Sequence, residues 1–118
     1  MVGLEQGLVM STDIQLILCN CPDEQIAGQI AEHLLHQQLA ACINLLPGVR
    51  SMYRWQGKLE VQTEVCLQIK APQQHFSAIS QAILTLHPYT VPEIIAVPVS
   101  QGFQPYLNWL HEECQSHA

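Results

Sequence analysis

The 118 residues are enough for one domain, and 48% of them are apolar whereas only 12% are charged. The formal net charge of −6, with only four basic residues, argues against binding to a nucleic-acid backbone or to an acidic membrane surface. The five cysteines form no CxxC pair, and no signal peptide or membrane-spanning stretch is recognisable. We therefore expect reduced thiols in a cytoplasmic protein that does not contact a membrane.

The N-terminal residues show no hydrophobic period, so we expect a flexible tail over residues 1–12 and one domain over residues 13–118. Met10 is an alternative start that the sequence does not decide. Ile14 to Asn20 is a nearly continuous apolar run, which predicts a short buried strand. Pro22 and the two acidic residues after it predict the start of a helix that continues to about Gln38.

The stretch from Ala41 to Lys70 has the pattern of a long β-hairpin. Gln56-Gly57 predicts the turn, and Pro47-Gly48 predicts a bulge or an edge in the first limb because proline donates no hydrogen bond to a sheet. In the second limb apolar residues alternate with polar ones, as in a strand with one buried face. The apolar face holds Leu59, Val61, Val65, Leu67 and Ile69.

Both limbs of this hairpin are longer than a typical strand of about six residues. Part of the hairpin should therefore extend beyond the sheet of a single domain, and that part carries Tyr53 and Trp55. Large apolar side chains on an unpaired strand favour aggregation unless another chain covers them. The sequence therefore predicts an oligomer.

A second helix is expected to begin at Ala71-Pro72 and to end at His87-Pro88, because the residue before proline is pushed out of the helical region. Its apolar stripe is Phe76, Ile79, Ile83 and Leu86. A loop to Glu93 follows, and Ile94 to Val99 is the last predicted strand, in which Pro98 suits a sheet edge. A final helix comes after Gly102.

The element order is β-α-β-β-α-β with an extra C-terminal helix, which predicts an α+β fold of the ferredoxin-like, split βαβ type. Right-handed crossovers should place both crossover helices on one face of a four-stranded antiparallel sheet. If strict alternation holds, the other face carries Cys19, Cys42, Asn44, Gln62, Glu64, Cys66, Gln68 and Lys70.

Several separated motifs together resemble the CutA proteins, the divalent-cation tolerance family. The matching motifs occur in order between about Ile14 and Leu110: Ala41-Cys-Ile-Asn44, Leu46-Pro-Gly48, Ser51-x-Tyr53-x-Trp55-x-Gly57-Lys58, Glu64-Val65, Ile69-Lys70, His87-Pro-Tyr89, Val91-Pro-Glu-Ile94 and Tyr106-Leu-x-Trp109. The resemblance implies a ferredoxin-like subunit and a tight homotrimer built from the hairpins. Its architecture would be similar to that of PII signalling proteins, with the sheets facing inward. The resemblance also implies a link to the tolerance of copper and other divalent cations.

The same resemblance implies a set of metal ligands, namely Cys19, His87 and Glu93. Thiolate, imidazole and carboxylate groups suit copper and similar ions. The alternative is structural, with His87 and Pro88 ending the helix and Glu93 pairing at a subunit contact. Cys19-x-Cys21 is a further thiol pair, whose side chains point the same way if the strand alternates. Cys21 is either a core or surface thiol or a member of a Cu(I) site.

Aromatic and charged residues offer a second kind of site. The aromatic residues are either interface anchors or the lining of a cleft between subunits, and they are Tyr53, Trp55, Tyr89, Tyr106 and Trp109. Lys58, Glu64 and Lys70 either pair with one another inside the trimer or recognise an anionic effector.

The sequence analysis therefore predicts a homotrimer that binds copper or another divalent metal ion in cation tolerance. We do not expect an enzyme, because GxSxG, HExxH, Walker A and GxGxxG motifs are all missing from the sequence. The alternatives are a PII-like sensor that binds a small anionic effector between subunits, and a trimeric scaffold. The sequence does not identify a protein partner.

Overall fold

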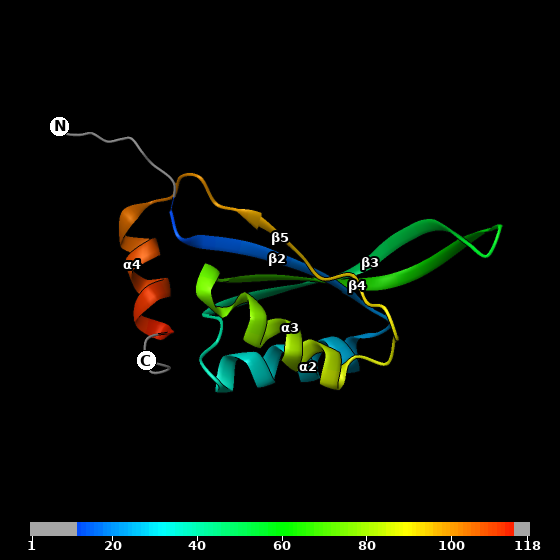
Figure 1. The fold of residues 1–118 in the computed structure, drawn as a ribbon, viewed down its shortest axis with the longest axis horizontal. Coiled ribbons are helices and arrows are strands. Elements are labelled where there is room, and N and C mark those ends of the chain that lie inside the picture. The colour runs from blue at the N-terminus through cyan, green and yellow to red at the C-terminus, as the bar shows by residue number, and fades with distance from the viewer. Residues whose placement is uncertain (1–11, 115–118) are drawn as a thin grey trace.

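A four-stranded antiparallel sheet forms the centre of the structure, a computed structural model that describes residues 12–114 (Figure 1). The elements in chain order are β2 (Ile14–Cys21), α2 (Glu24–His36), β3 (Cys42–Trp55), β4 (Lys58–Pro72), a 3-10 turn (Gln73–His75), α3 (Phe76–Leu86), β5 (Ile95–Pro98) and α4 (Gln104–Glu113). This order confirms the predicted βαββαβ pattern with its extra C-terminal helix. Of the predicted tail, only Thr12 is described, and the candidate start at Met10 lies outside the described residues.

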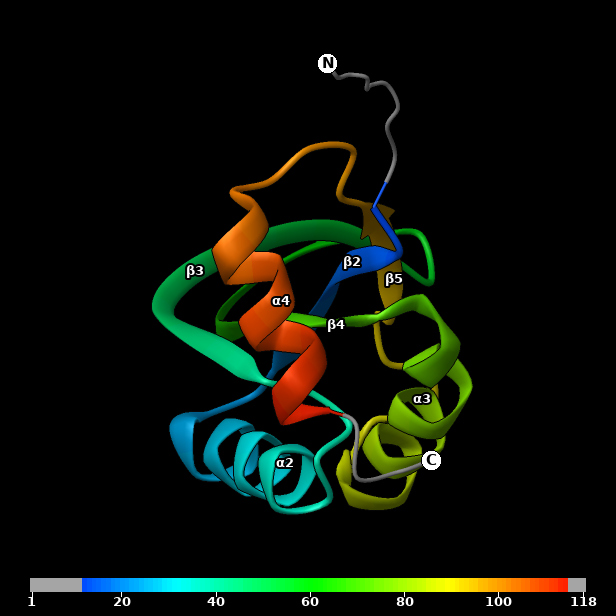
Figure 2. The same cartoon turned by 90° about the vertical axis from the view of Figure 1, so that its left-hand side faces the viewer.

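The strands are arranged in the order β3-β4-β2-β5, which is the ferredoxin-like arrangement. Helices α2 and α3 lie side by side on one face of the sheet (Figures 1 and 2). Between them and the sheet is the main core, whose fully buried members include Ile17, Ala27, Ile30, Leu34, Leu67, Ile69, Ile79 and Ile83. Strand β5 is an edge strand, so Pro98 can lie there without removing a hydrogen bond from the middle of the sheet.

The β3–β4 hairpin extends well past the helices (Figure 1), and the chain measures 54 × 28 × 22 Å along its principal axes. Gln56 and Gly57 turn the chain with φ angles of 51° and 80°, the positive pair that a two-residue hairpin turn requires. Leu59 and Val61 continue the predicted apolar face, but they are 72% and 49% exposed because no helix covers this part of β4.

The predicted bulge is present in β3. Leu46 pairs with Cys66 and Val49 with Glu64, so β3 advances by three residues where β4 advances by two. Gly48 has a φ of 74° at this point, a conformation in which glycine avoids the steric cost that other residues carry.

The face opposite α2 and α3, which we term the open face, differs from the prediction at one position. Cys19 does not lie on it, because its side chain is fully buried in the main core on the helix side. The prediction failed because strand β2 is apolar on both faces, so hydrophobicity alone could not fix which residues point inward. Helix α4 covers one end of the open face, where Leu107 and Leu110 pack against Ile14. No helix among residues 12–114 is long and apolar enough to cross a membrane.

Candidate metal centre

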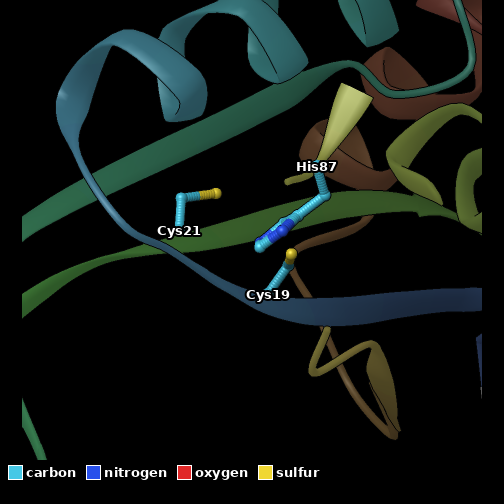
Figure 3. A group of neighbouring side chains, drawn as sticks. All are labelled: Cys19, Cys21 and His87. Carbon is cyan, nitrogen blue, oxygen red and sulfur yellow. The ribbon is translucent and has the colours of Figure 1, made fainter. Parts of the chain in front are cut away.

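Two thiols project from β2 into the main core. Cys19 and Cys21 occupy alternate positions of the strand, so both side chains point toward the helices, and both are 0% exposed (Figure 3). Antiparallel pairing of Cys19 with Leu67 and of Cys21 with Val65 fixes their register. The expectation that the two thiols point the same way is therefore confirmed.

His87 reaches the same place from the end of α3. Its backbone has extended angles, φ −81° and ψ 135°, which end the helix before Pro88 as predicted. His87 is 6% exposed, and one of its ring nitrogens and the sulfur atoms of Cys19 and Cys21 all lie within 4.8 Å of one another. Segments far apart in the sequence thus bring two sulfur atoms and one imidazole into a single buried group.

Backbone groups determine the protonation state of the His87 ring. The N–H of Tyr89 donates to Nδ1 over 3.1 Å, and Nε2 lies 2.8 Å from the carbonyl oxygen of Asn20. A carbonyl only accepts, so Nε2 carries the proton and Nδ1 uses its lone pair on Tyr89. The ring is therefore a neutral imidazole that joins the loop after α3 to the end of β2.

The two thiols influence each other's ionisation. The pKa of Cys19 is raised, first by its hydrogen bond to Cys21 and then by burial, with Glu93 and Cys66 adding smaller repulsion. The pKa of Cys21 is lowered, because the hydrogen bond from Cys19 outweighs the effect of its own burial. Of the two thiols, Cys21 is therefore the one that loses its proton first, with the Cys19 thiol donating a hydrogen bond to it. Thiolates are the form that binds metals.

Glu93, the third predicted ligand, lies beside this group rather than in it. Its side chain is exposed, and its Oε1 accepts a hydrogen bond of 3.4 Å from Nδ2 of Asn20. The structure thus unites Cys19 and His87, adds Cys21, and leaves Glu93 outside the group of ligand atoms within 4.8 Å. The signal for Cys21 in the sequence is its spacing of two from Cys19 on a strand. Two thiols and an imidazole are a donor set that suits a soft metal ion.

Tyr89 connects this group to the open face. Its ring centroid is 4.6 Å from that of His87, and its hydroxyl donates to Oε2 of Glu64 over 2.9 Å. Glu64 is only 6% exposed, whereas the neighbouring Gln62, 3.4 Å from the same hydroxyl through its Oε1, is exposed. Tyr89 therefore links His87, through its backbone N–H, to Glu64 on strand β4, through its hydroxyl.

The remaining predicted site residues lie in two other places. Trp55 and Lys58 are paired beside the hairpin turn, with Tyr53 two residues before Trp55 on the same strand. Lys70 lies near α4, where its Nζ donates to Oδ1 of Asn44 over 2.8 Å and contacts Sγ of Cys42 at 3.7 Å. The rings of Tyr106 and Trp109 stack on α4, with centroids 5.8 Å apart. Within one chain these residues do not form a single cleft.

Comparison with known proteins gives a consistent match over most of the chain. A family model described as CutA1 divalent ion tolerance protein matches residues 15–113. The chain is 46% identical over 99 residues to the divalent-cation tolerance protein CutA of Pectobacterium atrosepticum, which covers 84% of this chain and 90% of that protein. Protein CutA of Mus musculus is 43% identical over 96 residues, covering 81% of this chain but 54% of the mouse protein, so the chain spans about half of that relative's length.

A solved structure shows the same fold. The crystal structure of CutA from Xylella fastidiosa superposes with a TM-score of 0.85 at 45% sequence identity, covering 87% of this chain and 99% of that one.

Proposed function

Because the chain belongs to the CutA1 divalent ion tolerance family, we propose that it binds metal ions, copper first, as a cytoplasmic homotrimer that acts in cation tolerance. The observation that carries this proposal is the meeting of Cys19, Cys21 and His87 within 4.8 Å in the core. All five cysteines are free, which fits a reducing compartment in which thiolates remain available to a metal.

The same group supports a binding role rather than an enzymatic one. A catalytic Cys–His pair needs a third group that orients the imidazole for proton transfer. Here His87 is oriented by a backbone amide and a backbone carbonyl, and its proton is directed at the carbonyl of Asn20 rather than at a thiol. The ring is therefore not placed to act as a base for Cys19.

The homotrimer is supported by surface that one chain leaves uncovered. The open face and the extended hairpin expose large apolar side chains, among them Leu46, Met52, Trp55, Leu59, Ile95 and Val97. Large apolar side chains exposed on a sheet face and on an unpaired hairpin favour association with further copies. Symmetric assembly through the hairpins would cover it and would leave α2 and α3 on the outside.

The test is a titration of the reduced protein with Cu(I) and Cu(II) against a competing chelator, on the wild type and a Cys19→Ser/His87→Ala double variant. We expect one tightly bound ion per subunit in the wild type and its loss in the variant. Weak binding, or binding that the double substitution leaves unchanged, would contradict the proposed function and would assign any residual binding to surface histidines.

A second candidate is a sensor of small anions, and Lys70 favours it. Within residues 12–114 this ammonium forms no ion pair, and its contacts with Asn44 and Cys42 are to neutral acceptors. A ligand selective for the folded state raises its thermal stability, so a panel of small carboxylates and phosphates tests this role by melting temperature, with Lys70→Met as the control. If the protein responds neither to metal nor to anions, the remaining candidate function is a scaffold for other proteins.

A further inference from the structure

We propose that Cys21 is a metal ligand equal in importance to Cys19, and that the resulting two-thiolate site selects a soft ion of the Cu(I) class over Zn(II). This inference rests on the proposed metal-binding function and deepens it. The resemblance to the family implies Cys19, His87 and Glu93 as ligands, and Cys21 is not among them. The structure instead puts Cys21 inside the group and Glu93 outside it.

The backbone of β2 already holds the two sulfur atoms at a separation that one ion can bridge. The side chains are two residues apart on one strand, and the pairing with β4 prevents either residue from rotating to the open face. Two metal–sulfur bonds of about 2.3 Å placed end to end span about 4.6 Å. The sulfur atoms lie within 4.8 Å of each other, so one ion can contact both, and a separation shorter than about 4.6 Å is met by a bent S–metal–S unit.

His87 is close enough to be a third ligand, but both of its nitrogens are already engaged. A metal ion at Nδ1 would displace the N–H of Tyr89, and one at Nε2 would displace the proton that the carbonyl of Asn20 accepts. Either exchange leaves a backbone group without its partner in a largely buried place. The two thiols give up only the hydrogen bond between them and the weak contact of Cys19 Sγ with the carbonyl of Asn20 at 3.9 Å. That carbonyl keeps its bond from His87, so binding at the sulfur atoms leaves no backbone group without its partner.

The number of available ligands sets the preference between ions. Structural Zn(II) sites need four ligands, and the group of Cys19, Cys21 and His87 supplies two sulfur donors and one imidazole whose nitrogens both bond to the backbone. Hard divalent ions need oxygen ligands, and the nearby carboxylate of Glu93 lies outside the group and accepts from Asn20. Soft ions that accept few thiolate ligands, such as Cu(I), match what the site offers.

The experiment compares single variants of the full chain under anaerobic, reducing conditions, with Cu(I) and Zn(II) each titrated against a chromophoric chelator. Cys21→Ser is compared with Cys19→Ser, and Cys66→Ser is the matched control. Cys66 pairs with Asn20 across the sheet, but it lies on the open face and outside the group. Losing a direct ligand should exceed the roughly 10–100-fold loss that a missing supporting residue causes. We expect more than 100-fold weaker Cu(I) binding in both site variants and no change in Cys66→Ser.

X-ray absorption of the Cu(I)-loaded wild type provides a measurement that does not depend on whether the variants fold. Two sulfur neighbours per copper support the proposal, and one sulfur neighbour overturns it. Cu(I) affinity lost in Cys19→Ser but retained in folded Cys21→Ser also overturns it, while leaving the proposed function intact. Zn(II) binding as tight as that of Cu(I) overturns the selectivity. If the wild type binds no metal at all, the proposed metal-binding function is itself contradicted.

Discussion

The hydroxyl of Tyr89 lies 2.9 Å from Oε2 of Glu64 and donates a hydrogen bond to it, which ties the loop after α3 to the open face of β4. Glu64 is 6% exposed and forms no ion pair within residues 12–114. Tyr89→Phe should therefore leave a buried carboxylate short of a donor and should lower the free energy of unfolding by about 1–3 kcal/mol. Denaturant unfolding at one fixed protein concentration measures the loss.

Glu64→Gln is the matched control for this bond, because an amide oxygen at the same place still accepts from the Tyr89 hydroxyl. Its loss of stability should be smaller than that of Tyr89→Phe. Equal stability of Tyr89→Phe and wild type would show that the hydrogen bond contributes nothing.

Tyr89 also predicts a dependence of stability on alkaline pH. Burial, followed by the hydrogen bond to Glu64, raises the pKa of Tyr89 from 10.0 to about 12. Between these values the unfolded chain has lost the proton that the folded chain keeps, so stability falls as pH rises. The gap in unfolding free energy between wild type and Tyr89→Phe should close from pH 10 to pH 12. A constant gap over this range would contradict the prediction.

His87 should stabilise the fold even without metal, because its ring joins Tyr89 to the carbonyl of Asn20. His87→Ala removes both hydrogen bonds and should lower the metal-free unfolding free energy by about 2–4 kcal/mol. The amide of Tyr89 should also exchange its hydrogen faster. His36→Ala, on the exposed side of α2, is the control and should change neither quantity. An unchanged Tyr89 exchange rate in His87→Ala would rule out this connection.

Trp55 is expected to anchor the assembly rather than the single chain. It is 59% exposed beside the hairpin turn, so its truncation removes no core contact within the chain. Trp55→Ala should shift the mass measured by light scattering at micromolar concentration from trimer toward monomer. Leu35→Ala, on helix α2 with 41% exposure, should leave the mass unchanged. A wild type that is monomeric under the same conditions would refute the trimer itself.

The sequence predicted the elements well wherever a local rule acts. Pro47-Gly48 predicted the bulge, Gln56-Gly57 the turn, and His87-Pro88 the end of α3, because each pair restricts backbone angles directly. The alternating second limb of the hairpin likewise predicted the buried Val65, Leu67 and Ile69.

The candidate site was less accessible to prediction because it depends on contacts distant in the chain. Strand β2 is apolar on both faces, so nothing local showed that Cys19 points toward the helices. The engagement of both His87 nitrogens depends on Asn20, 67 residues away, and on the fold of the loop after α3. The proximity of Cys21 to His87 follows from the same tertiary arrangement.

The bulge at Pro47-Gly48 also has a consequence for the surface of the hairpin. Side chains along a strand have a period of two, so one additional residue reverses which parity faces each side. Before the bulge the even-numbered Cys42, paired with Lys70, faces the open side, whereas beyond it the odd-numbered Tyr53 and Trp55 share a side with Glu64. Deleting a single residue here would make the pairing continuous from Leu46 to Val49, and Tyr53 and Trp55 would stay beside Glu60 and Lys58 on their present side. Because a bulge bends and twists its strand, the deletion would instead change the direction in which the hairpin leaves the sheet.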